Sequence, residues 1–335
     1  MKIAYLLEST DLSGGAKVAL MQAEALARRG HRVTVVSPDA APDWFPLSQA
    51  HFERSAFSDA PALTAADVRV ATFWKTAAPA VAGARGPVFH LCQGYEGQFS
   101  FYANDRARIE EAYRLPTVKL AVSPTLAARL DALGFGPAID VGQAFDARAF
   151  APGPPREAAD PPVVLVVGPT AVDLKGIGIA LDGLALWRAR GGRFRLRRVS
   201  YFPCEEDERR RGLTDEYHYT LPPERMPFAY RASDLFIGPS RAEEGFGLPA
   251  LEALASGLPS ALSDTPAHRD MAGEAAVFFR DGDAASLADA LPGLATEAAR
   301  ERARRAGPDA ARRFDAAAVA ERLERAFRDA LGKAA

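Results

Sequence analysis

The stretch KIAYLLESTDLSGGAKVALMQAEALARRGHRVTVVSP, residues 2–38, decides the fold class. It begins with a short apolar run at 2–8, which is followed by a polar break that contains two glycines. Residues 16–30 then show helical periodicity and end on a glycine, as is typical of a helix C-terminus. A β-branched run at 31–38 stops at a proline. This order predicts a βαβ unit with a glycine loop at its first strand-to-helix junction.

The same alternation restarts in the second half of the chain. VVLVVG at 163–168 has the continuous apolar character of a buried strand, and strand-like and helical segments alternate from there onward. Between the halves, residues 146–162 carry five prolines and no apolar periodicity, which indicates a linker. We therefore predict two doubly wound α/β domains with Rossmann-like parallel sheets. Because such sheets bind ligands beyond the carboxyl ends of their strands, we expect the site in a cleft between two facing domains.

Composition and charge limit the class of protein. The chain has 335 residues, of which 48% are hydrophobic and 25% charged, as expected of a globular protein with ordinary cores. The net charge of −2 offers no field that would attract nucleic acid, so we expect no nucleic-acid partner. Cys92 and Cys204 lack a metal-type spacing. Free thiols in a reducing compartment are favoured, and a disulfide stays open.

The two ends of the chain add further expectations. The N-terminus has only a short apolar stretch, unlike a signal peptide, and no run of about twenty apolar residues follows. We therefore expect a cytoplasmic protein, with peripheral contact at the inner face of a membrane left open. Residues 308–332 carry apolar side chains about four positions apart, which predicts an amphipathic helix.

The candidate site is EEGFGLPALEALASGLP at 243–259, which follows a predicted strand. Pro249 suits the first turn of a helix. We expect Glu252 in that turn, where the helix dipole favours an ionised carboxylate that can accept hydrogen bonds from a ribose diol. Glu244 lies in the preceding loop, and Gly245 and Gly247 allow main-chain N–H groups to approach a phosphate. These features describe a nucleotide-sugar site, although two solvated acids on an ordinary strand–loop–helix remain the alternative on spacing alone.

The exact residues narrow this choice. PSRAEEGFGLPALEALASGLP and the following SDTPAHRDMAGEAAVFFRDGDAASLADAL resemble the E-x7-E signature and its continuation in retaining glycosyltransferases of family 4 (glycosyltransferase group 1), which have the GT-B fold. The resemblance implies that Glu244 contacts the donor sugar and Glu252 the ribose. It also implies donor contacts along Gly245 to Leu248, where N–H groups near Phe246 and Gly247 serve the diphosphate and the sugar.

LKG at 174–176 supplies a second candidate. Lys175 lies in a predicted strand-to-helix loop, where its charge can neutralise a diphosphate, and a solvated loop lysine is the alternative. The resemblance favours a functional role, because the family has a lysine–glycine pair in this place. The family also has an arginine about six residues earlier, where this chain has Pro169. Arg241 is a candidate for the second charge, and main-chain N–H groups together with Lys175 are the alternative.

In the first half of the chain, the resemblance points to two strand ends. Gly15 corresponds to the second glycine of a pair that lies close to the donor. Lys17 stands where the family often has Glu or Gln, which makes it a candidate for contact with an anionic acceptor, with a solvated lysine as the alternative. A family histidine that hydrogen-bonds the donor sugar corresponds either to His90 or to Gln93. We favour Gln93, because strand ends face the expected cleft, and a buried His90 is then structural.

Two aromatic residues near the same rim are candidates for acceptor contact. Trp74 follows a predicted strand and has a place in the core as its alternative, and Tyr95 lies two residues beyond Gln93. Neither position carries a readable code for the acceptor.

The resemblance implies a metal-independent glycosyltransferase that retains the anomeric configuration and needs no cofactor. It implies an acceptor-binding domain at 1–150, a donor-binding domain at 151–312 and a C-terminal helix at 313–335 that packs back on the first domain. UDP, GDP and dTDP stay open as donor nucleotides, as do carbohydrate, lipid-linked and small-molecule acceptors and the oligomeric state. A GT-B-fold sugar-nucleotide epimerase and a non-catalytic nucleotide-sugar-binding protein are the two alternative functions.

Overall fold

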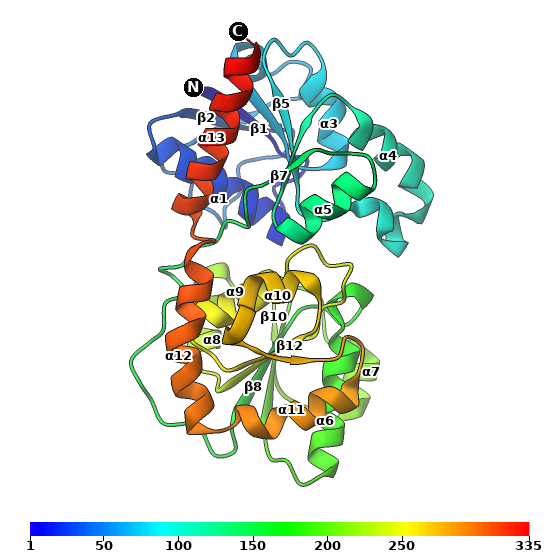
Figure 1. Ribbon diagram of the computed structural model, residues 1–335, viewed down its shortest axis with the longest axis vertical. Coiled ribbons are helices and arrows are strands. Elements are labelled where there is room, and N and C mark those ends of the chain that lie inside the picture. The colour runs from blue at the N-terminus through cyan, green and yellow to red at the C-terminus, as the bar shows by residue number, and fades with distance from the viewer. Residues whose placement is uncertain (335) are drawn as a thin grey trace. The chain divides into compact units, whose positions relative to one another are not determined.

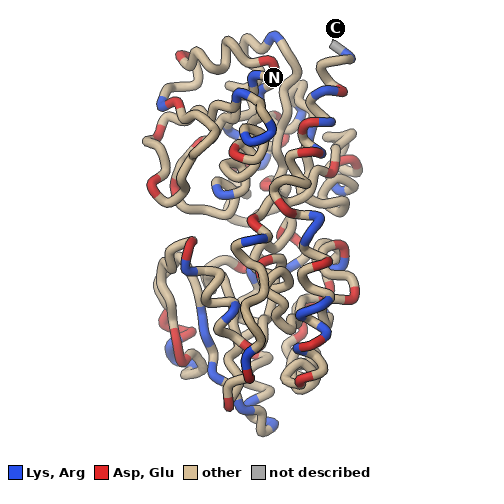
Figure 2. Tube along the Cα trace, turned by 90° about the vertical axis from the view of Figure 1, so that its left-hand side faces the viewer, with Lys and Arg blue, Asp and Glu red and all other residues tan. Residues whose placement is uncertain are grey.

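The computed structural model describes residues 1–334, which form two compact units. Unit 1 comprises Met1–Asp146 together with the C-terminal segment from Phe314, and unit 2 is Ala147–Arg313. Each unit is built around its own parallel sheet with helices on both faces (Figure 1). Basic and acidic residues are interspersed along both units, in keeping with the small net charge (Figure 2).

Unit 1 has a seven-stranded sheet in the order β3-β2-β1-β4-β5-β6-β7, and every neighbouring pair is parallel. The strand order reverses between β1 and β4, so this is the topological switch point, where a doubly wound sheet opens a crevice. The strands are β1 Lys2–Leu6, β2 Arg32–Ser37, β3 His51–Arg54, β4 Val68–Ala71, β5 Val88–Cys92, β6 Val118–Ala121 and β7 Ala138–Asp140. The connecting helices are α1 Gly14–Arg28, α2 Pro61–Ala65, α3 Trp74–Val81, α4 Arg106–Arg114 and α5 Pro124–Ala132, with 3-10 turns η1 Glu96–Gln98 and η2 Ser100–Asp105.

Unit 2 has a six-stranded parallel sheet in the order β10-β9-β8-β11-β12-β13, with its switch point between β8 and β11. Its strands are β8 Val163–Val167, β9 Arg195–Ser200, β10 Thr214–Tyr219, β11 Leu235–Gly238, β12 Ser260–Ser263 and β13 Val277–Phe279. Its helices are α6 Ile177–Ala189, α7 Glu206–Arg211, α8 Met226–Arg231, α9 Leu248–Ala255, α10 Pro266–Ala272, α11 Ala284–Leu294 and α12 Glu297–Arg312, with 3-10 turns η3 Asp173–Lys175, η4 Pro223–Arg225 and η5 Gly273–Ala275.

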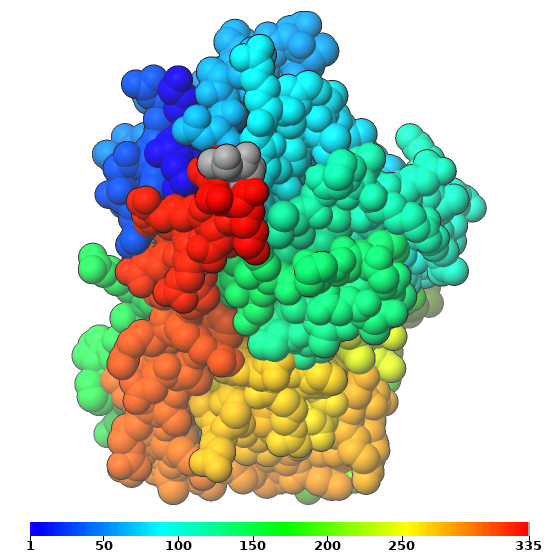
Figure 3. Space-filling model, turned by 45° about the horizontal axis from the view of Figure 1, so that its top comes forward, coloured from blue at the N-terminus to red at the C-terminus, as the bar shows by residue number. Residues whose placement is uncertain are grey.

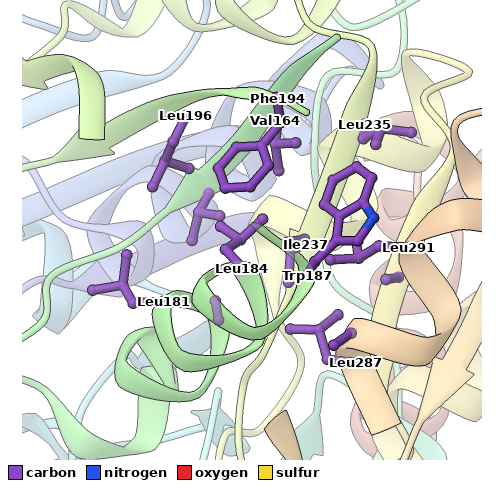
Figure 4. Packing of buried hydrophobic residues seen from close by; sticks show 14 of the residues in the cluster. Val164, Leu181, Leu184, Trp187, Phe194, Leu196, Leu235, Ile237, Leu287 and Leu291 are labelled. Atoms are coloured by element: carbon purple, nitrogen blue, oxygen red, sulfur yellow. The ribbon is translucent and has the colours of Figure 1, made fainter. Parts of the chain in front are cut away.

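The core of unit 2 explains why the apolar run at 163–167 forms a central strand. Val164 and its neighbours on β8, β9 and β11 pack against α6 and α11, and all these side chains are buried (Figure 4). Trp187 at the end of α6 stacks on Phe194 before β9, with ring centroids 5.3 Å apart. Burying a side chain of this kind contributes about 1.5–3 kcal/mol. The core therefore fixes β8 and β11, the two strands whose ends carry the candidate site.

The helix predicted at 308–332 is in fact two helices. α12 ends at Arg312, and α13 Ala316–Ala334 begins after a short break. α13 belongs to unit 1, where its surface lies beside that of the N-terminal residues (Figure 3). Phe327 is fully buried with its ring 4.7 Å from that of Phe89, and Arg29 at the end of α1 forms ion pairs with Glu321 and Glu324. Packing on α1 and β5 thus accounts for the apolar stripe of this helix.

Within residues 1–334, no helix is both long enough and apolar enough to cross a membrane.

Candidate functional site

The loops that follow β8 and β11 are in direct contact, because these strands are neighbours on either side of the switch point. Arg241 N donates a hydrogen bond to Leu174 O over 2.9 Å. Gly176 has φ +62°, and a Cβ there would lie only 2.0 Å from Pro239 O. A glycine is therefore required at position 176, and its close approach holds the loop of Lys175 against the loop that carries Glu244.

Lys175 and Glu244 form an ion pair at this edge of the sheet, with Lys175 Nζ donating to Glu244 Oε1. Their side chains are 24% and 12% exposed. Burial raises the pKa of Glu244, but the charge and hydrogen bond of Lys175, helped by Ser240, outweigh burial and leave that pKa below its usual value. Glu244 Oε2 is buried and lacks a partner in hydrogen-bonding geometry within the described chain. The site thus holds an ionised carboxylate with one oxygen unused.

Helix α9 begins beside this pair. Gly247 is its N-cap residue, with φ +90° and ψ +60°, and Leu248 is the first helical residue. No side chain caps the helix, and Pro249 in the first turn has no N–H to satisfy. A helix N-terminus without a side-chain cap next to a lysine is suited to bind an anion such as a phosphate.

Glu252 lies just beyond the first turn of α9, in which it was predicted. It is the fifth residue of α9, whose first turn contains no acid, so the expected contact with the positive helix end is wrong. The carboxylate is only 5% exposed and accepts a hydrogen bond of 2.9 Å from the Tyr230 hydroxyl. Burial, with the nearby charge of Glu252, holds the pKa of Tyr230 well above its usual value, so the hydroxyl remains a donor. Tyr230, on α8, therefore positions this carboxylate.

The His268 ring lies next to Gly247. Its Nδ1 lies 3.0 Å from Ser263 O, a carbonyl that can only accept, so Nδ1 carries the proton. Burial lowers the pKa of this histidine, which keeps the ring neutral and leaves Nε2 as an acceptor. A Cβ on residue 247 would lie 3.0 Å from Nε2. The histidine thus packs against the turn that begins α9.

Arg241 was the candidate for the second positive charge at the diphosphate, in place of the family arginine at position 169. Arg241 points to Asp281, with 3.1 Å between Nε and Oδ1, so its charge is already paired. A different arginine serves the loop of Pro169: Arg198 on β9 is fully buried and donates to Val166 O and Gly168 O, each over 2.8 Å. Its charge is balanced by Glu208, also fully buried, at 2.8 Å. Arg198 therefore stabilises the end of β8, and its guanidinium group is already bonded to other residues of the protein.

In unit 1, Gly15 and Gln93 come together. Gln93 Nε2 donates to Gly15 O over 3.0 Å, which links the end of β5 to the start of α1. The glycine pair belongs to the helix and not to a loop before it: α1 begins at Gly14, and Ser13 caps it by accepting from Ala16 N. Lys17 is the fourth residue of α1 and is half-buried.

His90 and Gln93 differ clearly in their surroundings. His90 is fully buried inside β5, its ring centroid lies 4.8 Å from that of the tilted Tyr113 ring, and neither ring nitrogen has a hydrogen-bond partner among the described residues. Burial and the charge of Lys119 lower the pKa of His90 to about 3, so its ring is neutral. Gln93 lies half-buried at the strand end. Of the two, Gln93 has the more accessible position.

The two aromatic candidates are buried. Trp74 begins α3, is 4% exposed and contacts Tyr102 edge-to-face at 6.3 Å. Tyr95 is 7% exposed, and its ring packs against Tyr113 and Phe135. Both side chains therefore pack inside unit 1 and expose little surface for contact with an acceptor.

Two doubly wound parallel-sheet units of this kind define the GT-B fold. The chain is similar over its whole length to Anabaena HepE, solved with UDP and glucose (TM-score 0.75, 18% identity, covering 98% of this chain and 99% of that one). It is also similar to sucrose-phosphate synthase from Thermosynechococcus elongatus (TM-score 0.75, 17% identity, 99% of each chain) and to the lipopolysaccharide outer core galactosyltransferase WaaB (TM-score 0.68, 16% identity, 98% and 99%). At these identities the likeness establishes the fold, as predicted.

Residues 161–297, which lie within unit 2, match the family model of glycosyl transferases group 1, and this match confirms the resemblance seen in the motif. Among related sequences, phosphatidyl-myo-inositol mannosyltransferase of Mycobacterium leprae is 38% identical over 102 residues, covering 30% of this chain and 27% of that protein. D-inositol 3-phosphate glycosyltransferase of Nocardia farcinica is 43% identical over 90 residues, covering 26% and 19%. The match thus spans about a quarter or less of the length of these relatives.

Proposed function

We propose that the protein is a glycosyltransferase that moves a sugar from a nucleotide-diphospho-sugar to an acceptor hydroxyl. The observation that carries this proposal is the Lys175–Glu244 pair beside the start of α9, at the switch point of unit 2. The lysine and the helix N-terminus suit the diphosphate of such a donor, and the carboxylate suits its sugar hydroxyls. The family match over unit 2 and the UDP complexes of Anabaena HepE support the same assignment.

The residues divide the donor between them. Lys175 and the N–H groups from Gly245 to Leu248 hold the diphosphate, and Glu244 accepts hydrogen bonds from the sugar once its lysine turns to the phosphate. Glu252, held by Tyr230, accepts from the ribose. In this proposal unit 2 is the donor-binding domain and unit 1 is the acceptor-binding domain, in which Gly15 and Gln93 are the candidate polar residues. Trp74, Tyr95 and Lys17 stay candidates for the acceptor side.

The reaction breaks the bond between the anomeric carbon and the leaving phosphate oxygen and forms the bond to the acceptor oxygen. The nucleoside diphosphate leaves with the bonding electron pair, and Lys175 with the α9 N–H groups stabilises its charge. The acceptor proton passes to the leaving phosphate on the same face of the sugar. This route gives retention, needs no separate base and needs no metal ion.

A thermal-shift screen tests the donor. UDP, GDP, dTDP and their sugars are added in EDTA, since a ligand that binds the native state raises its melting temperature. The matching nucleotide and its sugar should give the largest shifts. No shift with any of them contradicts the donor assignment.

A turnover assay tests the function. With the identified donor and an acceptor panel that includes inositol-containing acceptors, suggested by the names of the two relatives, product should form in EDTA. A requirement for a divalent ion contradicts the metal-free route. Conversion of the donor with no acceptor added indicates the epimerase, and binding without turnover or hydrolysis indicates the non-catalytic protein.

A further inference from the structure

Unit 2 contains a cavity at the edge of its sheet opposite to the candidate site. Residues 233–234 and 256–259 line it, and they directly precede β11 and β12. Lys175 and Glu244 instead follow β8 and β11. The four residues of β11 separate the two edges by roughly 13 Å. The cavity has a volume of about 90 Å³, which admits several waters or one small polyatomic ion.

The cavity is positively charged. Four arginines line it, from the linker, the end of α8 and two turns of α12: Arg156, Arg231, Arg300 and Arg304. The acids in the lining are Asp234 and Glu297, so the guanidinium charges exceed the carboxylate charges by two. The C-terminal ends of α8 and α9 offset about half a charge each. A net positive charge remains.

The walls of the cavity are closely packed. A Cβ on Gly153 would lie 3.1 Å from Arg231 Cδ, and a Cβ on Gly257, which has φ +67°, would lie 3.0 Å from Arg304 Cα. Arg304 Nη2 also donates to Gly153 O over 2.7 Å. The linker, the end of α8, the end of α9 and α12 therefore enclose a defined space.

Hydrogen-bond donors remain unused in this space. Arg304 spends one Nη2 donor on Gly153, while a guanidinium offers five N–H groups. Ser256 lines the cavity and is only 6% exposed, and its buried Oγ has no hydrogen-bond partner in the part of the chain that the structure describes. Buried hydroxyl groups in folded proteins nearly always have a partner. A ligand with several acceptor oxygens would satisfy both groups.

We propose that this cavity binds a tetrahedral oxyanion, either free phosphate or the phosphoryl group of a monoester. Arg304 provides forked donors that match phosphate oxygens, and Ser256 donates one further hydrogen bond. Arg300, which donates to Arg156 O and pairs with Glu297, adds positive charge. Because Gly153 and Arg156 belong to the linker, a bound oxyanion fastens the linker to α12. This site is separate from the donor site, so it does not rest on the proposed function.

Calorimetric titration of the full chain with inorganic phosphate, at constant ionic strength set by chloride, tests this proposal. The wild-type protein should bind one phosphate at this site. Arg304→Gln should weaken binding at least tenfold, since it removes a charged hydrogen bond, and Ser256→Ala should weaken it less. Arg305→Gln is the matched control: this arginine is exposed on the same helix and lies outside the cavity lining, so binding should be unchanged.

Two further variants keep the result interpretable. Arg304→Lys retains the charge and the stem if the glutamine variant folds poorly, and it should bind phosphate with intermediate affinity. Lys175→Ala alters the proposed donor site, and it should retain the phosphate binding that Arg304→Gln removes. Phosphate binding that survives Arg304→Gln but is lost in Lys175→Ala, or no phosphate binding by the wild type, overturns the proposal. Glucose 6-phosphate in a parallel titration separates the sources: tighter binding than phosphate identifies a monoester site, and weaker binding a site for the free ion.

Discussion

Lys175 and Glu244, 69 positions apart in sequence, form an ion pair between the loops after β8 and β11. In the proposed mechanism the two side chains bind different parts of one donor. The ion pair therefore separates when the diphosphate binds. The charge of Lys175 thus favours the ionised form of the largely buried Glu244 carboxylate.

Removal of the lysine should affect both stability and binding. In Lys175→Met, the buried Glu244 carboxylate loses its charged partner, which should cost about 1–3 kcal/mol of unfolding free energy. Binding of the nucleoside diphosphate should weaken at least tenfold. Urea unfolding and calorimetry measure the two effects. The double variant Lys175→Met/Glu244→Gln should recover part of the stability but none of the diphosphate affinity; full recovery of binding would show that the lysine does not contact the diphosphate.

The turn before α9 should tolerate no side chain. Gly247→Ala combines the strain of φ +90° with a Cβ 3.0 Å from His268 Nε2, and we expect a loss of about 1–3 kcal/mol and weaker donor binding. Gly30→Ala is the matched control, since Gly30 has φ +89° with open space around it. Thermal unfolding of both variants separates strain from contact. Equal losses of stability in the two variants would indicate that the His268 side chain moves away from the new Cβ at no energetic cost.

The Tyr230 hydroxyl should affect the binding of ligands that contain a ribose and leave the binding of other ligands unchanged. Tyr230→Phe removes the hydroxyl that holds Glu252, so nucleoside diphosphate binding should weaken several-fold. Pyrophosphate, which lacks a ribose, should bind equally well to the wild type and the variant. Calorimetry with both ligands checks this difference, and equal weakening for both would place Glu252 outside the ribose site.

The buried pair of Arg198 and Glu208 should dominate the stability of unit 2. Arg198→Met leaves a buried carboxylate unpaired and should cost about 3–5 kcal/mol, whereas Arg198→Met/Glu208→Leu should cost much less. Burial raises the pKa of Glu208, but Arg198 and the hydroxyl donors outweigh it and the pKa is lowered.

The lowered pKa of Glu208 has a defined sign in pH experiments. A depressed carboxyl pKa contributes stability above the pKa of the unfolded chain, and this contribution is lost as pH falls through the folded value. The wild type should therefore lose stability on acidification below about pH 4.5, and the double variant should lose less. Urea midpoints between pH 3 and 7 measure this; parallel curves would exclude the pair as a cause.

Much of the fold follows from local pattern. The run at 163–167 and the βαβ unit at 2–38 form the expected strands and helix, because their apolar periodicity is fixed by burial on both faces of a parallel sheet. The three-residue strand β7 was missed, as were the strands β3 and β10. Their residues are half-exposed and polar, as in HFER of β3, so they carry no apolar signal.

The candidate site was predictable where single residues carry the signal. Lys175, Glu244 and the glycines of the loop stand out by type and spacing, whereas their pairing depends on which strands are neighbours. Arg198 and Glu208 lie in RLRRVS and EEDERRR, where charged residues suggest solvent. The alternation of β9, which buries Leu196 and Arg198 together, was the available signal. Glu252 was expected in the first turn but is the fifth residue of α9, because the helix already begins at Leu248.

The most direct test of the account is a proton NMR spectrum of the reaction. The wild-type protein, the nucleotide-sugar that gives the largest thermal shift, and the acceptor panel are incubated in EDTA. The account predicts a new anomeric signal with the configuration of the donor, together with free nucleoside diphosphate, and neither product with Lys175→Met. A product of inverted configuration, or undiminished turnover by the Lys175→Met variant, would contradict it.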